Sequence, residues 1–250
     1  MPVIAHLSDP HLDLSTLRCR RLDAVLEQIL DLGFVDALLV SGDLSDHGAA
    51  EEYGAFFAAL PPALPTLVVA GNHDLAAPLI DAADAAGRSR SLDAQLNSFL
   101  DLDGLRLIGL DSHIDGRDDG FLSQQTLEFA RARIAETEVP SILALHHPPV
   151  PIGHHLADDS FRLTNPGDLA AILEEFPQVI GVFAGHVHAA LATTFEGVPV
   201  LGAPGIVSTM RLGSKVDPIA DTEAMPGLAL HTITDRTIRT VFHYLSPSAL

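Results

Sequence analysis

Short runs of apolar residues recur along the chain, and a small group of polar residues closes each run. Within a run, apolar positions do not alternate with polar ones, which is typical of strands that are buried on both faces. We predict six such strands at residues 3–7, 36–40, 66–70, 105–110, 141–145 and 179–184.

Helical patterns lie between these predicted strands. Apolar residues from Leu22 to Leu30 repeat at helical spacing, and Gly33 stands where such a helix would end. Residues 49–60 form a second candidate helix, Ser123 can cap a third, and Asn165 followed by Pro166 has the pattern of a cap that opens a fourth. Strands that alternate with helices predict an α/β fold in which parallel strands are joined by helical crossovers.

The pattern changes after His188. Residues 191–195, 198–203, 228–234 and 237–244 are predicted strands separated by turns, so we expect part of the sheet to be antiparallel. We regard the C-terminal strands, within 205–250, as a candidate dimer contact. Residues 150–165, which include Gly153, His154 and His155, are irregular and form a candidate lid.

Composition and charge limit the classes of partner. The chain has 250 residues, enough for one large domain over 1–250, and a net charge of -19, with 33 acidic against 14 basic residues. We therefore expect neither a nucleic-acid polymer nor an anionic membrane surface as a partner. No apolar run approaches the roughly 18 residues that span a bilayer. The single cysteine, Cys19, and the lack of a basic start before an apolar stretch favour a cytoplasmic location.

The polar residues at the strand ends have the chemistry of metal ligands. In an open α/β sheet, ligands bind beyond the carboxyl ends of the strands. Two carboxylates, one carboxamide and five imidazoles follow five of the predicted strands, namely Asp9, His11, Asp43, Asn72, His73, His146, His186 and His188. Oxygen and imidazole donors without a thiolate favour metals such as Mn, Fe, Zn or Co.

This number of donors suits two ions that share a carboxylate. Paired metals about 3.5–4 Å apart recur at sites where hydroxide attacks phosphorus in line. Asp9 and Asp43 offset only part of the charge of two divalent ions, so such a pocket would attract phosphate although the whole chain is acidic. Most exposed carboxylates are screened beyond about 8 Å.

Each of these residues also has a purely structural interpretation. Asp9 and Asp43 could form turns, Asn72 could adopt a left-handed turn conformation, and His146 could be a buried histidine with satisfied hydrogen bonds. Their joint occurrence at successive strand ends favours the metal site.

The order of these motifs resembles the calcineurin-like metallophosphoesterases over roughly residues 1–210. The matching segments are Asp9-Pro10-His11, Gly42-Asp43, Gly71-Asn72-His73-Asp74, His146 and Gly185-His186-Val187-His188. The segment His146-His147-Pro148-Pro149 makes the chain similar to the bacterial class III cyclic nucleotide phosphodiesterases and the related glycerophosphodiesterases.

The resemblance implies a four-layer α/β/β/α sandwich with two mixed β-sheets and a role for each residue. Asp9, His11 and His188 would hold the first ion, and Asn72, His146 and His186 the second. Asp43 would bridge both ions. His73 would contact the phosphate and protonate the leaving oxygen, and Asp74 would orient His73 by accepting a hydrogen bond from its other nitrogen.

We therefore expect a phosphodiesterase that uses two Mn, Fe or Zn ions and a metal-bound hydroxide to cleave a small phosphodiester, with a 3′,5′-cyclic nucleotide as the preferred substrate. Glycerophosphodiesters, 2′,3′-cyclic nucleotides and phosphomonoesters are alternatives at the same site. A catalytically silent binding scaffold is an alternative of another class. The sequence lacks the Gly-x-Ser-x-Gly elbow of serine hydrolases.

Other residues have weaker signals. Strand geometry predicts that the side chain of His147 points away from the metals. His154 and His155, in the candidate lid, and Arg211, after a late strand, could contact the substrate, and His113 matches no metal motif.

Overall fold

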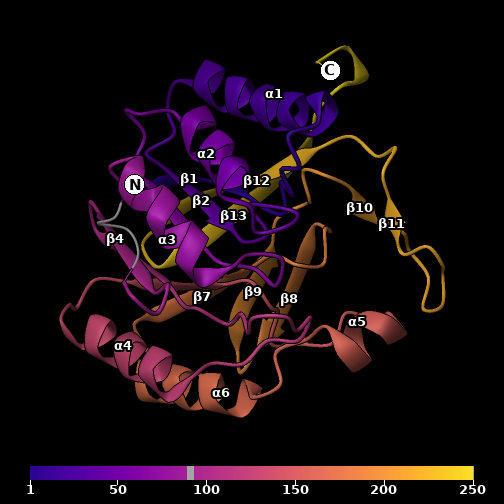
Figure 1. The fold of residues 1–250 in the computed structure, drawn as a ribbon. Coiled ribbons are helices and arrows are strands. Elements are labelled where there is room, and N and C mark those ends of the chain that lie inside the picture. The colour runs from indigo at the N-terminus through magenta and orange to yellow at the C-terminus, as the bar shows by residue number, and fades with distance from the viewer. Residues whose placement is uncertain (89–92, 250) are drawn as a thin grey trace.

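The computed structural model describes residues 1–88 and 93–249, and two mixed β-sheets form its centre (Figure 1). The five-stranded sheet contains three parallel strands, β1 (Val3–Leu7), β2 (Ala37–Ser41) and β3 (Thr66–Val69). On the other side of β1, β12 (Gly227–Thr234) pairs antiparallel with β1, and β13 (Thr237–Tyr244) pairs antiparallel with β12. The order of this sheet is β13-β12-β1-β2-β3.

The six-stranded sheet has the order β4-β5-β6-β7-β9-β8. Four neighbouring strands are parallel, and an antiparallel strand lies at each edge. The strands are β4 (Ser98–Leu102), β5 (Leu105–Gly109), β6 (Ser141–Leu145), β7 (Val179–Ala184), β8 (Leu191–Phe195) and β9 (Val198–Gly202). A separate short hairpin joins β10 (Thr209–Met210) to β11 (Ala220–Asp221).

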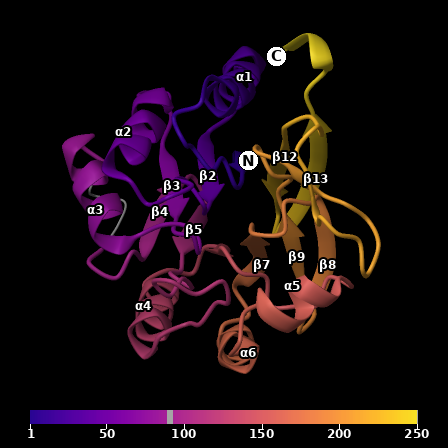
Figure 2. The ribbon, with the colours of Figure 1, turned by 45° about the vertical axis from the view of Figure 1, so that its right-hand side comes forward.

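Helices cover the outer face of each sheet (Figures 1 and 2). One side carries α1 (Thr16–Leu32), α2 (Ala50–Ala59) and α3 (Ala76–Ala85), and the other carries α4 (Gln124–Ala135) and α6 (Pro166–Glu175). Two short elements, α5 (His155–Ser160) and the 3-10 helix η2 (Pro247–Ala249), complete the described residues. The expected α/β/β/α sandwich with two mixed sheets is confirmed.

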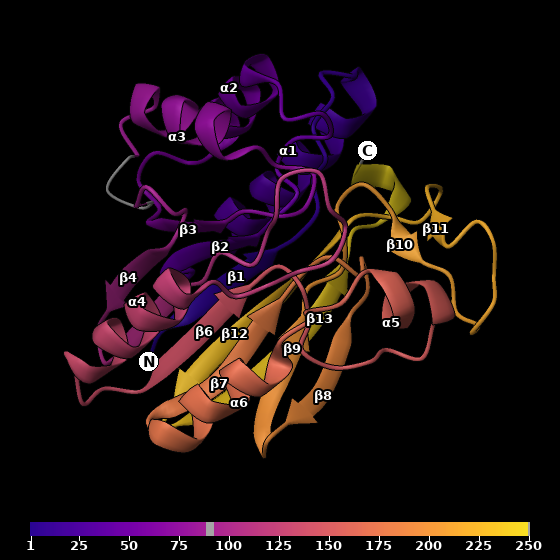
Figure 3. The same ribbon diagram turned by 60° about the horizontal axis from the view of Figure 1, so that its bottom comes forward.

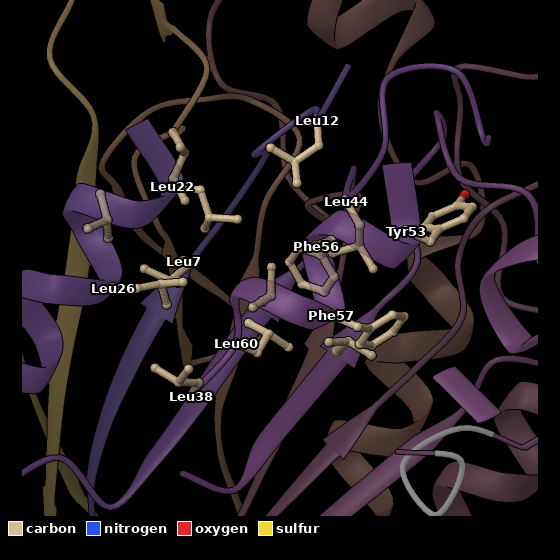
Figure 4. Close-up of a cluster of buried hydrophobic side chains, with 14 of the residues drawn as sticks. Leu7, Leu12, Leu22, Leu26, Leu38, Leu44, Tyr53, Phe56, Phe57 and Leu60 are labelled. Carbon is tan, nitrogen blue, oxygen red and sulfur yellow. The ribbon is translucent and has the colours of Figure 1, made fainter. Parts of the chain in front are cut away.

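The alternation of side chains along the buried strands explains this layering. In β2, Leu38 and Val40 face α1 and α2, whereas Leu39 faces the other sheet. Because successive side chains of a strand point to opposite faces, an uninterrupted apolar strand fills two interfaces at once. Three apolar clusters result, one under each helical layer and one between the sheets, and Figure 4 shows part of the cluster beneath α1 and α2.

Several helix ends follow the predicted signals. Ser15 and Ser123 accept hydrogen bonds from the backbone N–H groups of Arg18 and Thr126, and Gly33 ends α1 in the left-handed conformation. Asn165 differs from the prediction because its side chain makes no cap bond. Its amide instead pairs with the backbone of Leu122, which ties the loop before α4 to the start of α6.

Some elements were not predicted. The alanine-rich α3, the edge strand β4 and the β10–β11 hairpin lack the strong apolar runs on which the sequence analysis relied. The irregular segment 150–165 contains α5. Across the two described ranges, no helix is both long and apolar enough to cross a bilayer.

Candidate metal centre

The seven predicted metal ligands lie on turns that follow five strands, and they come from both sheets. Turns after β1, β2 and β3 of one sheet carry four of them, and turns after β6 and β7 of the other sheet carry three. The structure brings all seven together, in the order Asp9, His11, Asp43, Asn72, His146, His186 and His188.

The first group consists of Asp9, His11, Asp43 and His188, whose ligand atoms lie within 4.8 Å of one another. The Nε2 atoms of His11 and His188 are 3.2 Å apart. The Oδ1 atom of Asp9 lies 3.5 Å from Nε2 of His188. Four donors from three turns therefore face one point, which is the arrangement that a cation requires.

The second group is centred on His146. Its Nε2 atom lies 3.0 Å from Oδ1 of Asn72 and 3.0 Å from Nδ1 of His186. The Oδ2 atom of Asp43 lies 3.4 Å from this nitrogen and 3.2 Å from Nε2 of His11. One carboxylate oxygen thus stands between the two groups, where it could be shared by two ions.

The turns that carry these residues have unusual backbone geometry. Left-handed backbone costs an ordinary L-residue roughly 1–2 kcal/mol, and such strain tends to gather at functional sites. Five of the seven predicted ligands have a positive φ, namely Asp9 (54°), His11 (44°), Asp43 (52°), His186 (69°) and His188 (50°).

Two glycines allow these turns to pack against each other. A Cβ atom on Gly71 would lie 2.2 Å from Oδ1 of Asp43, and one on Gly185 would lie 2.2 Å from Oγ of Ser8. Real Cβ atoms do not approach other atoms so closely. The glycines before Asn72 and His186 are therefore needed for the close contact between turns.

Three of the imidazoles are oriented through the nitrogen that faces away from the centre. In each, Nδ1 has its own hydrogen-bond partner, which leaves Nε2 directed at the other donors, the arrangement common among metal-binding histidines. The partners are Oδ1 of Asp46 for His11 (3.0 Å), the carbonyl of Ser41 for His146 (2.7 Å) and Oγ of Ser208 for His188 (2.7 Å). None of these three partners was predicted from the sequence, although the position of Asp46 three residues after Asp43 was a usable signal.

The ionisable groups of the site shift one another's pKa values. Burial opposes protonation of His11 and His146, but the adjacent Asp43 carboxylate outweighs burial and raises the pKa of His11 to about 10 and that of His146 to about 9. The same imidazoles hold the pKa of Asp43 well below its usual value. Burial lowers the pKa of His186 and His188. The pocket thus stabilises positive charge beside Asp43.

The residues fit a pair of divalent cations. Oδ2 of Asp9 is buried and has no hydrogen-bond partner among the described atoms, so it is a free donor at the first group. An unpaired buried carboxylate oxygen is costly unless a cation satisfies it. Carboxylate, carboxamide and imidazole donors suit Mn, Fe and Zn.

His73 and Asp74 differ from the expected arrangement. His73 lines the cavity, and its Nδ1 donates to the carbonyl of Asp46 at 3.0 Å, rather than to Asp74. Asp74 is fully buried and accepts from the backbone N–H groups of Gly71 and Leu44, so it joins two of the turns. Burial and the Asp43 charge raise the pKa of Asp74 to about 6. The expected hydrogen bond from His73 to Asp74 was wrong, because Nδ1 of His73 pairs with a backbone carbonyl and the Asp74 carboxylate is taken up by buried backbone N–H groups.

The remaining predicted side chains have structural contacts. The prediction that the side chain of His147 points away from the metal centre was wrong. Its Nδ1 lies 2.8 Å from Oγ of Ser112, and its buried Nε2 has no hydrogen-bond partner among the described atoms. With His146 and His186 it forms a group whose ligand atoms lie within 4.8 Å of one another. His113 pairs with Asp111. Arg211 lies within the β10–β11 hairpin, 3.9 Å from Asp221, and does not line the cavity.

A cavity of about 370 Å³ opens above the two donor groups. Its floor includes His11, Asp43, Asn72 and His186, and His73 stands at its side. Its walls are largely apolar and are formed by Ala157, Phe161, Val187, Thr209, Met210, Ile219 and Ala220, with the carboxylate of Asp118.

Comparisons with known proteins identify relatives of this chain. The family model described as calcineurin-like phosphoesterase matches residues 2–190. The chain is 34% identical over 258 residues to a probable cyclic nucleotide phosphodiesterase of Rhodococcus erythropolis, covering 94% of this chain and 81% of that one. It is 30% identical over 181 residues to the glycerophosphodiester phosphodiesterase GpdQ of Enterobacter lignolyticus, covering 69% of this chain and 63% of that one. A dimetal phosphatase from Danio rerio shares the fold, with a TM-score of 0.71, 14% identity and coverage of 98% and 99%.

Proposed function

The chain belongs to the calcineurin-like phosphoesterases, and from this premise we propose that it is a dinuclear phosphodiesterase whose substrate is a small phosphodiester, with a 3′,5′-cyclic nucleotide as the first candidate. The observation that carries the proposal is the position of Asp43, whose Oδ2 atom lies between Nε2 of His11 and Nε2 of His146. A shared carboxylate is the feature that separates a two-ion site from a one-ion site.

Each residue then has a defined task. Asp9, His11 and His188 would hold one ion, Asn72, His146 and His186 would hold the other, and Asp43 would belong to both. When bound, two such ions would activate a water molecule and offset the charge that builds on the phosphoryl oxygens.

His73 supplies the proton for the leaving oxygen. A carbonyl can only accept a hydrogen bond, so Nδ1 of His73 carries a proton that it donates to Asp46. This contact fixes the ring and leaves Nε2 as the atom that can hold or release a proton toward the cavity.

The charge of the cavity favours a diester over a monoester. None of the described residues that line the cavity is Lys or Arg, and Asp118 adds a negative charge to the wall. A phosphomonoester carries about 1.5–2 negative charges at neutral pH, whereas a diester carries about one. Beyond the two ions, the second charge of a monoester would therefore find no basic side chain among the described residues of the wall, where Asp118 is the charged residue.

The relatives support two kinds of diester. Similar chains are named as cyclic nucleotide and glycerophosphodiester phosphodiesterases. The largely apolar wall that Phe161, Met210 and Ile219 form suits the flat nucleobase of a cyclic nucleotide better than the hydroxyl-rich glycerol group. We therefore place 3′,5′-cyclic nucleotides first, 2′,3′-cyclic nucleotides second and glycerophosphodiesters third.

The test uses metal-stripped protein loaded separately with Mn, Fe or Zn. Each form is assayed with 3′,5′-cyclic AMP, 2′,3′-cyclic AMP, glycerophosphoethanolamine and a 4-nitrophenyl monoester, and bound metal is counted by mass spectrometry. We expect two ions per chain and a higher kcat/KM for the diesters than for the monoester. A folded protein that binds no metal and cleaves none of these esters would be a catalytically silent scaffold.

A further inference from the structure

Two segments that are far apart in the sequence form the walls of the cavity. One segment is α5, which contributes Ala157, together with Phe161 directly after it. The other is the β10–β11 hairpin, which contributes Met210 and Ile219. Figure 3 shows α5 and the hairpin on the same side of the molecule. The space available to a bound ester therefore depends on how these two segments are held together.

Two consecutive histidines connect α5 to the hairpin tip. The backbone N–H of His155 and its Nδ1 both donate to the carbonyl of Ser214, at 3.2 and 2.8 Å. Nε2 of His154 donates to the carbonyl of Val216 at 3.2 Å, and the His154 side chain is buried at this contact. We call these three hydrogen bonds the His154–His155 latch.

The base of the hairpin is fixed to the metal centre by contacts that the latch does not share. Oγ1 of Thr209 and the backbone N–H of Met210 both donate to the carbonyl of His188, at 2.9 and 3.3 Å. The buried guanidinium of Arg21 donates to the carbonyls of Ile206 and Ala224, each at 2.6 Å. The base should therefore stay in place when the tip moves.

A glycine precedes each side of the latch. Gly153 has a φ of 87° and stands directly before His154, and Gly213 has a φ of 130° and stands directly before Ser214. A Cβ atom on Gly153 would meet nothing within 4 Å, so that side of the residue is open, while its backbone N–H donates to Oδ2 of Asp158 at 3.0 Å. Glycine changes its backbone conformation more easily than other residues, so each of the two segments can bend next to the latch.

We propose that the His154–His155 latch limits the size of the ester group that the cavity accepts, so that these histidines determine substrate specificity without touching the reacting atoms. The inference rests on the proposed function, because it concerns the substrate of the same site. With the latch closed, the walls bound the cavity of about 370 Å³. With the latch broken, the tip of the hairpin can move away from α5 and the cavity can take a larger group.

The test compares two diesters that share a leaving group. Methyl 4-nitrophenyl phosphate and thymidine 5′-(4-nitrophenyl) phosphate both release 4-nitrophenolate, so they differ in the ester group that is retained. The measured quantity is the ratio of kcat/KM for the thymidine ester to kcat/KM for the methyl ester. Because both reactions use the same ions and the same leaving group, changes in metal loading cancel in this ratio.

The key variant is His154→Ala/His155→Ala, and its matched control is His154→Gln/His155→Asn. The amide nitrogen of Gln can replace Nε2 and that of Asn can replace Nδ1, so the control keeps a donor at each position and removes the imidazoles. The alanine pair removes the two side-chain hydrogen bonds of the latch and keeps the backbone bond from His155 to Ser214. We expect it to raise the ratio about fivefold, a change of the size that the loss of one or two hydrogen bonds produces. The Gln/Asn pair should keep the wild-type ratio.

Hydrogen exchange gives an independent readout on the same proteins. Amides between residues 211 and 219 should exchange faster in the alanine pair, whereas amides near Thr209 should not change. A ratio that stays the same or falls in the alanine pair, or an equal rise in the Gln/Asn pair, overturns the latch. Wild-type protein that is loaded with metal and cleaves neither ester overturns the proposed function instead.

Discussion

The substitution His73→Asn separates the proton-donating role of this residue from its structural contact. The amide nitrogen of Asn can take the place of Nδ1 and keep the hydrogen bond to the carbonyl of Asp46, which is 3.0 Å long in the structure. What the substitution removes is Nε2, the atom that faces the cavity. The metal ligands do not change, so the variant should still bind two ions.

The size of the effect depends on the leaving group. An alkoxide needs a proton as the P–O bond breaks, and loss of a positioned acid costs about 10²–10⁴-fold in kcat, or about 3–5 kcal/mol at 1.36 kcal/mol per tenfold. A 4-nitrophenolate is stable as an anion and needs little help. We therefore expect kcat for 3′,5′-cyclic AMP to fall by about 10²–10⁴-fold, and kcat for bis(4-nitrophenyl) phosphate by less than about tenfold.

The assay measures kcat for both esters at saturating substrate, with the metal content of the same samples determined in parallel. An equal loss for both esters would show that His73 acts on binding or on the metal centre rather than on the leaving oxygen. A loss of bound metal would also refute the reasoning, since it would make His73 a structural support of the centre.

Three further predictions follow from the geometry. Asp43→Asn should reduce the metal content from two ions to at most one per chain, since the oxygen between His11 and His146 loses its charge; a titration that still gives two ions would contradict the sharing. Burial lowers the pKa of His113, but Asp111 outweighs it and raises the pKa to about 9. The stabilisation by the His113–Asp111 pair is therefore complete below about pH 6.5 and is lost as the pH rises through about 9. The unfolding free energy of the wild-type protein should exceed that of His113→Gln, and this difference should shrink by about 2–3 kcal/mol across that window. A difference that does not change with pH would refute the prediction. Phe56→Ala should lower the unfolding free energy, measured in urea, by about 3–5 kcal/mol, because the ring of Phe56 is fully buried in the apolar cluster beneath α1 and α2 (Figure 4). A loss below about 1 kcal/mol would contradict this, since it would mean that neighbouring side chains fill the space that the ring leaves.

The sequence was sufficient to predict the buried strands and the residues at their ends. Strands 3–7, 141–145 and 179–184 were predicted with the bounds that the structure shows, because uninterrupted apolar runs are the strongest signal that a chain carries. Parallel neighbours place their carboxyl ends at one edge, so the strand pattern predicted the meeting of Asp9 and Asp43, which follow β1 and β2 of one sheet. His146 follows β6 of the other sheet, so the strand pattern alone could not place it beside them.

Contacts that depend on backbone carbonyls could not be predicted. The carbonyl of Ser41 orients His146, and the carbonyl of Asp46 takes the hydrogen bond that was expected at Asp74. Every residue has a carbonyl, so composition and spacing say nothing about which one will face a given imidazole. The left-handed conformation of His188 was also hidden, since Gly, and less strongly Asn and Asp, are the residues that signal such backbone in a sequence.

The division of the donors between two sheets has a consequence for the order of assembly. Asp9 to Asn72 precede the whole of the six-stranded sheet in the chain, whereas His146, His186 and His188 follow strands within it. A growing polypeptide therefore carries more than half of the donors long before the rest exist, and it cannot enclose a pair of ions until Ile142 and Phe183 have packed against Leu39 and Leu67. Under the proposed function, capture of metal would therefore follow the docking of the two sheets, and a chain whose sheets dock wrongly would fail to retain its ions.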